Sequence, residues 1–294
     1  MTEVLIAGVA VADIVMQVAQ LPRRAEKYRA TDAVITVGGC AANAAVAVAR
    51  HGGTARLAAR LGRDPMGDLI AAALEGEGVD LSLSDRREGA RSSFSSIYVD
   101  AAGERQIMNY RGAGLAETLD LSTVPRPDAV LADNRWPALT QAALAAARRW
   151  GVPGIVDAEA PFEGDALRGA THIAFSMQGL SAYAPGLSVV NALARARAEY
   201  GAWVAVTDGA NGVWYSGDAG IGHVPAFAVA VVDTLGAGDI WHGAFTLRIA
   251  EGAEEVDAIC FANAAAALKC RAFGGAAACP DRKATEEFLK EVAP

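Results

Sequence analysis

The chain has 294 residues, of which 52% are apolar and 20% are charged, and its formal net charge is −8. This composition is that of a folded globular protein and excludes a disordered chain or a fibrous repeat. Its Lys and Arg residues are scattered, which argues against nucleic acid as a partner, because binding a phosphate backbone needs clustered basic side chains. There is no internal repeat or linker, so we expect residues 1–294 to form a single domain.

Neither a leader segment nor a membrane span is predicted. Met1-Thr2-Glu3 has no basic residue, the apolar stretch after it ends at Asp13, and no later stretch reaches the length of a spanning helix. The four cysteines form no CxxC pair and have no His partners at metal-ligand spacing, so we expect reduced thiols in a cytoplasmic protein. These cysteines are Cys40, Cys260, Cys270 and Cys279.

Short apolar, β-branched runs alternate with Ala-rich helical stretches along most of the chain. This alternation predicts a parallel sheet covered by helices on both faces, which is an α/β fold. Asp64-Pro65 predicts an N-cap followed by a proline in the first helical turn. The predicted strands include Val4–Val11, Gly154–Val156, Ile173–Phe175 and Val204–Val206, and the predicted helices include Ala41–Arg50, Met66–Glu77, Ala138–Trp150, Val190–Tyr200 and Glu255–Lys269.

Two segments, about 14–37 and 92–112, interrupt this alternation. In the second, Ser93–Asp100 and Glu104–Tyr110 flank a turn that contains Gly103, which predicts antiparallel strands outside the main sheet. We interpret the two segments as a small lid of strands. An extra hairpin at the edge of the main sheet fits the pattern equally well.

The stretch Asp233-Thr234-Leu235-Gly236-Ala237-Gly238-Asp239 precedes an apolar, helix-compatible run, Ile240–Ala250. A glycine-rich turn that opens a helix lets backbone N–H groups approach an anion, and the helix N-terminus adds partial positive charge, so a phosphoryl group fits there. Asp239 is then an ordinary first-turn acid or a base directed at a substrate hydroxyl, and the residues alone leave both open. The chain has no GxxxxGK[ST], and the third position of GxGxxG is Trp241, which excludes a Walker loop and a dinucleotide fingerprint.

A second glycine-rich stretch, Gly38-Gly39-Cys40-Ala41-Ala42-Asn43-Ala44-Ala45, has the form of a strand-to-helix turn, which close packing alone would explain. Together with the stretch that ends at Asp239, it resembles the signature pair of the ribokinase-like (PfkB) family of carbohydrate kinases. Asp13, the run 62–68 and the run 206–212 also fall in family order. The resemblance covers nearly the whole chain and implies a three-layer α/β/α sandwich with a β-sheet lid, with the sugar between lid and sheet.

The resemblance also implies roles for individual residues, with ATP and Mg²⁺ as cofactors, a small sugar as substrate and a homodimer that pairs through the lid. Magnesium is expected because it neutralises the β- and γ-phosphate oxygens. Asp239 matches the catalytic base, and Gly236, Ala237 and Gly238 match its anion hole; Asp13, Gly38, Gly39 and Asn43 match the sugar site; Thr207, Gly209 and Gly212 match the ATP site, with Asn263 and Gly274 as candidates for its adenine side.

One departure from the family concerns the metal. Many members carry an Asn-x-x-Glu motif that organises water around it, and the corresponding stretch here, Ser176-Met177-Gln178-Gly179, has neither residue. Asp157, or else Glu159, is the candidate for an outer-shell carboxylate. A carboxylate that simply ends a strand and faces a loop is the alternative.

The surroundings of three polar residues, Lys27, Asn109 and Arg135, resemble those of the sulfofructose kinases of this family, in which the corresponding residues hold the sulfonate at carbon 6. An arginine fork and a lysine charge suit an oxyanion. We therefore expect an ATP-dependent kinase for the 1-hydroxyl of 6-deoxy-6-sulfofructose. Residue types alone leave open fructose 6-phosphate, 2-keto-3-deoxygluconate, and a sugar-binding protein without turnover.

Overall fold

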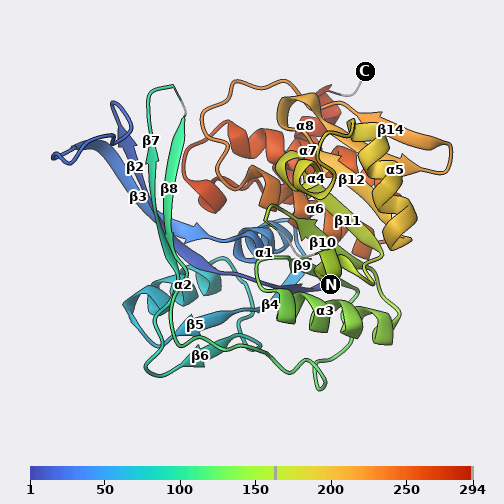
Figure 1. The fold of residues 1–294 in the computed structure, drawn as a ribbon, viewed down its shortest axis with the longest axis horizontal. Coiled ribbons are helices and arrows are strands. Elements are labelled where there is room, and N and C mark those ends of the chain that lie inside the picture. Colours follow the sequence, from blue (N-terminus) through green and yellow to red (C-terminus); the bar gives the residue numbers. More distant parts are fainter. Residues whose placement is uncertain (103, 162–163, 293–294) are drawn as a thin grey trace.

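The structure is a computed structural model that describes residues 1–102, 104–161 and 164–292. Its centre is a sheet with the strand order β14-β13-β12-β11-β10-β9-β1-β4 (Figure 1). The strands from β12 to β4 pair in parallel, as predicted, and β13 and β14 pair antiparallel at one edge. These strands are β1 (Glu3–Ala7), β4 (Thr54–Ala58), β9 (Ala129–Asp133), β10 (Gly154–Ala158), β11 (His172–Ser176), β12 (Trp203–Thr207), β13 (Val213–Gly217) and β14 (Gly220–Val224).

Helices cover both faces of this sheet. Successive side chains of β1 face opposite sides, so Ile6 packs into the core with α1, α6 and α7, while Leu5 packs with α3. The predicted three-layer α/β/α sandwich is confirmed. The helices are α1 (Cys40–Arg50), α2 (Pro65–Gly76), α3 (Pro137–Trp150), α4 (Met177–Tyr183), α5 (Val189–Tyr200), α6 (Ala237–Ala250), α7 (Glu255–Cys270) and α8 (Arg282–Val292), with 3₁₀ turns at Gly164–Leu167, Gly209–Asn211 and Gly275–Ala278.

The two predicted lid segments form a separate four-stranded sheet, in the order β3-β2-β7-β8, which excludes an extra hairpin on the main sheet. Its outer pairs are antiparallel, but the central pair, β2 with β7, is parallel, so the prediction of antiparallel strands was wrong at this position. The turn at Gly103 lies outside the described residues. The strands are β2 (Val11–Val18), β3 (Ala30–Gly38), β7 (Phe94–Val99) and β8 (Arg105–Tyr110), and β5 (Arg60–Gly62) pairs with β6 (Asp85–Arg87) in a small third sheet.

The sequence predicted one strand over the apolar run Val4–Val11, and this prediction was wrong. β1 ends at Ala7, and the N–H of Val9 then donates to the buried carboxylate of Asp133 at 2.8 Å. Asp133 also accepts the N–H of Ala41 at 3.1 Å. A distant side chain thus interrupts the strand and directs the chain from the main sheet into the lid.

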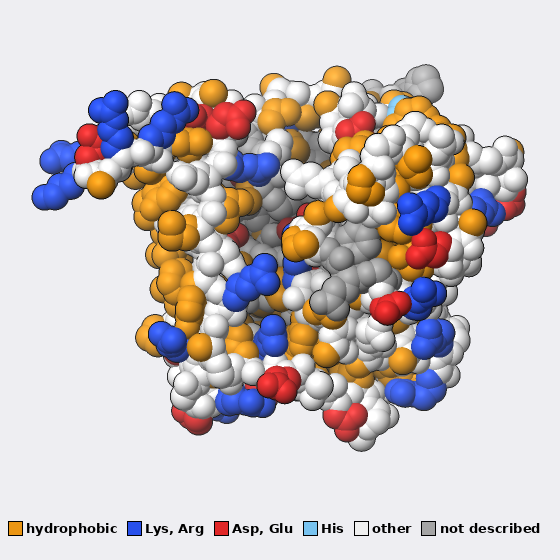
Figure 2. All heavy atoms as spheres, in the orientation of Figure 1, with side chains coloured by type: hydrophobic (Ala, Val, Ile, Leu, Met, Phe, Trp, Pro, Cys, Tyr) orange, Lys and Arg blue, Asp and Glu red, His pale blue; other side chains and the backbone are white. Residues whose placement is uncertain are grey.

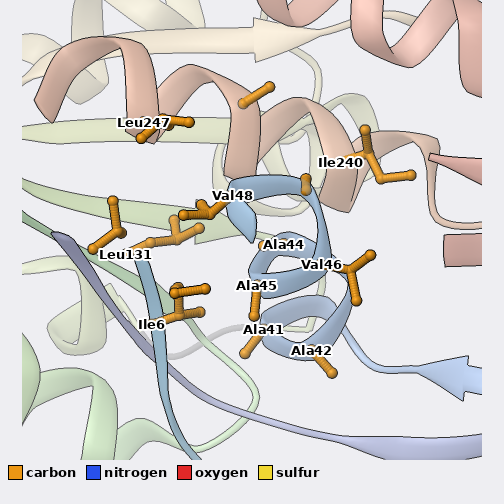
Figure 3. Close-up of a cluster of buried hydrophobic side chains, with 14 of the residues drawn as sticks. Ile6, Ala41, Ala42, Ala44, Ala45, Val46, Val48, Leu131, Ile240 and Leu247 are labelled. Carbon is orange, nitrogen blue, oxygen red and sulfur yellow. The ribbon is translucent and has the colours of Figure 1, made fainter. Parts of the chain in front are cut away.

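Helices α1 and α6 approach each other closely. A Cβ on Gly243 of α6 would lie 2.4 Å from the carbonyl oxygen of Ala44, so only glycine fits there. The Ala-rich face of α1 packs between α6 and the sheet, and Figure 3 shows Val48 of α1 among Ile6, Leu131 and Leu247. This packing fixes the relative position of the polar residues at the start of each helix.

The predicted helices are confirmed, with boundaries that differ from the prediction by at most three residues. The N-cap of α2 forms as predicted, since the carboxylate of Asp64 accepts the N–H of Gly67 at 2.9 Å and Pro65 follows the cap. The helix predicted over Ile240–Ala250 begins at Ala237, directly after Gly236. None of the described helices has the length and apolar character that crossing a membrane requires.

Candidate active site

Two cavities meet at the N-terminal end of α6. The first has a volume of about 560 Å³ and lies between the lid and the main sheet, and the second, of about 580 Å³, lies beside β12 and α7. Both are lined by Thr234, Gly238 and Arg105. Figure 2 shows the surface hollowed between the lid and the rest of the molecule, with basic side chains at its edge. A group held at the start of α6 would therefore contact the contents of both cavities.

The first cavity collects most of the predicted sugar-site residues. Asp13 of β2 is buried in its wall, and it stands in register with Ser95 and Asn109 on the neighbouring lid strands. Burial raises the pKa of Asp13, and its hydrogen bond with Ser95 opposes that rise. The predicted residues that line this cavity are Asp13, Gly39, Asn43, Asn109, Arg135, Gly236, Gly238 and Asp239.

Two further predicted residues have a different relation to this cavity. Gly38 lies beneath Asp13, because a Cβ on Gly38 would be 1.9 Å from an oxygen of that carboxylate. Lys27 is exposed in the loop between β2 and β3 and is not among the described residues that line the cavity. Within one chain, therefore, the structure does not bring Lys27 together with Asn109 and Arg135.

Asp239 lies in the first turn of α6 and faces the first cavity. Its carboxylate accepts a hydrogen bond of 2.6 Å from the side-chain amide of Asn43, at the start of α1. Burial raises the pKa of Asp239 to about 8, and the nearby carboxylates of Asp157 and Glu159 act in the same direction, while the Asn43 amide opposes them. A carboxylate with this pKa is well suited to accept a proton near neutral pH.

The turn before Asp239 separates the two cavities. Gly236 caps α6 with a left-handed backbone (φ +76°) and lines the first cavity, Ala237 lines the second, and Gly238 lines both. The N–H of Ala237 donates to the carbonyl of Thr234 at 3.2 Å, whereas those of Gly236 and Gly238 have no backbone partner among the described residues and are available to an anion. The three predicted anion-hole residues therefore lie at the junction of the cavities.

Four arginines from separate parts of the chain line the first cavity, and only Arg135 was singled out from the sequence. Arg135 pairs with the carboxylate of Glu159 and donates to the carbonyl of Ala160 at 2.8 Å. Arg60 lies over the ring of Trp136, 4.3 Å from its centre, and donates to a backbone carbonyl. The four are Arg60, Arg105, Arg111 and Arg135.

The second cavity has a mostly apolar wall. Ala226, Phe227 and Val229 contribute to it, and such a wall suits a flat aromatic base. The predicted residues Thr207, Gly209, Gly212 and Asn263 line it, but Gly274 is not among the described residues that do so. The N–H of Gly274 instead donates to Asp233 at 3.2 Å.

The residues around Asp157 fit the water shell of a metal ion. The carboxylates of Asp157 and Asp239 offer oxygens within 4.8 Å of each other, and the thiol of Cys40, which is not a magnesium ligand, lies in the same cluster. One oxygen of Asp157 has no hydrogen-bond partner among the described residues and lies 3.5 Å from Nε2 of His242. Magnesium prefers oxygen donors and keeps several waters. Ser176, where the family has Asn-x-x-Glu, uses its hydroxyl to cap α4, and Glu159, the other candidate for the metal's water shell, pairs with Arg135.

Comparison with known proteins shows to which family the chain belongs. Residues 1–282 match the pfkB family carbohydrate kinase. The chain belongs to this family. It is an ATP-dependent carbohydrate kinase, which transfers a phosphoryl group to a hydroxyl.

Relatives of this kinase share its full length. Ribokinase of Bacillus subtilis is 29% identical over 98% of this chain and 100% of its own. A protein of Agrobacterium tumefaciens that has been proposed to be a ribokinase has a solved structure with a TM-score of 0.93, 36% identity, and coverage of 99% and 98%. Ribokinase of Arabidopsis thaliana, solved with ribose and ATP, has a TM-score of 0.84, 25% identity and coverage of 98% of each chain.

Sequence reasoning missed several residues that line the first cavity of the kinase. Arg105 lies four residues before Asn109 and Arg111 two residues after it, so both share a face of β8 and its extension with Asn109, because alternate residues of a strand share a face. Once Asn109 was assigned to the site, that spacing was a usable signal. Arg60 gave no such signal, because it comes from a short strand of another sheet.

Proposed function

We propose that this kinase transfers the γ-phosphoryl group of ATP to the 1-hydroxyl of 6-deoxy-6-sulfofructose. The observation that carries the proposal is the arginine content of the cavity in which Asp239 lies. A neutral sugar needs hydrogen-bond partners but no compensating charge, whereas a sulfonate buried without cations would be strongly destabilised. Ribose, bound in the Arabidopsis structure, is a neutral sugar of that kind.

The charges of the cavity favour an anionic substituent. Its four arginines outnumber its three carboxylates, Asp13, Glu159 and Asp239. With a pKa of about 8, Asp239 is largely protonated at neutral pH, which increases the excess of positive charge. Arg135 and the Asn109 amide are the proposed sulfonate partners, because a guanidinium pairs with two oxygens of an oxyanion and an amide donates without adding charge.

The proposed reaction uses Asp239 as the base. Its carboxylate accepts the proton of the 1-hydroxyl, the hydroxyl oxygen bonds to the γ-phosphorus, and the bond from that phosphorus to the β,γ-bridging oxygen breaks, which releases ADP. The N–H groups of Gly236 and Gly238 stabilise the charge on the moving phosphoryl group. Magnesium, when bound, neutralises phosphate oxygens, and Asp157 would hold part of its water shell.

We further propose that the protein is a cytoplasmic homodimer that pairs through the lid. Ile35 and Met108 lie on the lid face opposite Asp13 and Asn109 and are 56% and 73% exposed. Figure 2 shows hydrophobic side chains along the lid. Lys27 would reach a sugar cavity only from a second copy. Sedimentation at about twice the chain mass of 30.3 kDa supports this pairing, and a monomer contradicts it.

The substrate is tested by ADP release with Mg-ATP and a set of sugars at equal concentration: sulfofructose, fructose 6-phosphate, fructose, 2-keto-3-deoxygluconate and ribose. We expect kcat/KM for sulfofructose to exceed that for neutral sugars by about 10²-fold or more, because a neutral sugar cannot pair with the excess positive charge of the cavity. Fastest turnover of ribose or fructose would contradict the proposal. No turnover of any sugar would favour a binding protein.

The raised pKa of Asp239 gives an expected pH profile. The base must be ionised to accept a proton, and the side chains that face it are Asp157, Glu159, Asn43 and His242. Below pH 8, kcat/KM for sulfofructose should rise about tenfold per pH unit, and it should level off above that value. The sulfonate does not titrate in this range, so the substrate does not contribute. A flat profile through this range would contradict the assignment.

A further inference from the structure

Lys269, near the end of α7, has no accessible surface, and the proposed reaction does not use it. Its ammonium donates to the backbone carbonyl of Asp233 and to the carboxylate of the same residue, both at 2.8 Å. Burying a lysine is costly unless its charge is compensated. A lysine fully enclosed beside the turn that opens α6 therefore calls for an explanation.

Asp233 links this ammonium to two backbone segments. One carboxylate oxygen accepts the N–H of Leu235 at 2.8 Å, and the other accepts the N–H groups of Gly274 and Gly275 at 3.2 Å each. The N–H of Asp233 in turn donates to the carbonyl of Cys270 at 3.2 Å. The start of the turn 233–238 and the segment after α7 thus converge on one ion pair.

The charge of Lys269 also matters for an anionic ligand. Asp233 stands at the start of the turn whose later residues line both cavities, and an uncompensated carboxylate there would repel a triphosphate. Burial alone raises the pKa of Asp233, but the Lys269 ammonium and the backbone N–H groups outweigh it and hold that pKa below its usual range. Asp233 therefore stays ionised, and Lys269 supplies its countercharge.

We propose that Lys269 is a positioning residue whose ammonium is a built-in cation that holds the turn 233–238 in its phosphate-binding form. It acts through Asp233 and does not contact substrate. The inference rests on the proposed function only in that this turn receives the transferred phosphoryl group. It does not depend on which sugar is phosphorylated, so its test uses whichever sugar the wild-type chain turns over fastest.

The test compares Lys269→Ala with Lys269→Met. Both remove the charge, but alanine leaves space beside Asp233, whereas methionine fills it. We expect kcat/KM for Mg-ATP to fall about 10- to 100-fold in both, because small displacements of a phosphate-binding turn are costly, with KM for the sugar nearly unchanged. Ammonium or potassium chloride should restore most of the loss in Lys269→Ala and little in Lys269→Met. Tetramethylammonium chloride at equal ionic strength controls for salt.

Lys283→Ala is the matched control, since Lys283 is an exposed lysine on α8 whose side chain is 82% exposed. It should behave as wild type in every assay. A folded Lys269→Ala with unchanged kcat/KM for Mg-ATP, or with a loss that ammonium and potassium leave unchanged, would overturn the proposal.

A second variant covers the case in which single substitutions do not fold. The double substitution Asp233→Asn with Lys269→Met removes both charges and keeps similar volumes, which avoids leaving a buried charge unpaired. We expect it to fold and to retain the loss in kcat/KM for Mg-ATP. Wild-type kinetics in this double variant would show that no cation is needed and would overturn the proposal. Inactivity of the wild-type chain on every sugar would instead count against the proposed function.

Discussion

Replacing Asp239 with asparagine should lower kcat for sugar-dependent ADP release by about 10²- to 10⁴-fold, which is the usual contribution of a general base. Binding of sugar and nucleotide should change little, because asparagine keeps the volume of the side chain and its amide oxygen can still accept the hydrogen bond from Asn43. Steady-state kinetics measure the first effect, and calorimetric titration measures the second.

The matched control is Asp257→Asn, since Asp257 is an exposed acid in the first turn of α7, as Asp239 is in the first turn of α6. It tests the interpretation of Asp239 as an ordinary first-turn acid. If both variants retain activity, that interpretation holds and the base assignment is wrong. Loss of activity in Asp239→Asn alone supports the base.

Asp239→Asn should also change the stability of the fold. Between the unfolded pKa of 3.8 and the folded pKa of about 8, the unfolded chain has released the proton of Asp239 and the folded chain still holds it, so the stability of the wild type falls as the pH rises through that range. Asparagine removes that loss. The Tm of Asp239→Asn minus that of wild type should therefore increase from about pH 5 to about pH 9. A constant difference would contradict the raised pKa.

Replacing Arg135 with methionine should weaken the transition-state binding of sulfofructose by about 2–5 kcal/mol, or roughly 30-fold to several thousand-fold in kcat/KM. Two effects add up: the sulfonate loses a guanidinium, and Glu159 loses its partner and remains as an unpaired carboxylate in the same cavity. Turnover of the neutral sugar fructose should fall much less. The measurement is kcat/KM for both sugars.

The control for Arg135 is Arg168→Met, because Arg168 is an exposed arginine paired with Asp165 on the surface, and exposed pairs contribute little. It should leave both kcat/KM values unchanged. Equal losses for sulfofructose and fructose in Arg135→Met would mean that the residue supports the fold of the cavity and does not recognise the anion.

Much of this fold could be predicted because its signals are local. The strands of the main sheet are short apolar runs, and the N-cap Asp64 marks the start of α2 in the sequence. The break after β1 could not be predicted, because it depends on Asp133, more than 100 residues further along the chain. The parallel pairing of β2 with β7 has the same origin, since strand pairing is set by contacts distant in sequence.

The candidate site divides in the same way. Asp239 and its turn form a contiguous motif, and the structure places them where the two cavities meet. The arginines converge from three separate segments, so only the alternation around Asn109 could have revealed two of them. Gly274 was assigned to the adenine side on a weak signal. In the structure its N–H donates to Asp233, which pairs with Lys269, and this contact depends on the packing of α7 and leaves no pattern in the sequence.

The measurement that tests the central proposal most directly is the identity of the product. Sulfofructose and fructose 6-phosphate are supplied together with Mg-ATP, and phosphorus NMR locates the new phosphate. The proposal predicts one product first, sulfofructose with a phosphate coupled to the protons at carbon 1, formed with one ADP for each phosphate. Preferential formation of fructose 1,6-bisphosphate, or a phosphate at another carbon of sulfofructose, would contradict it.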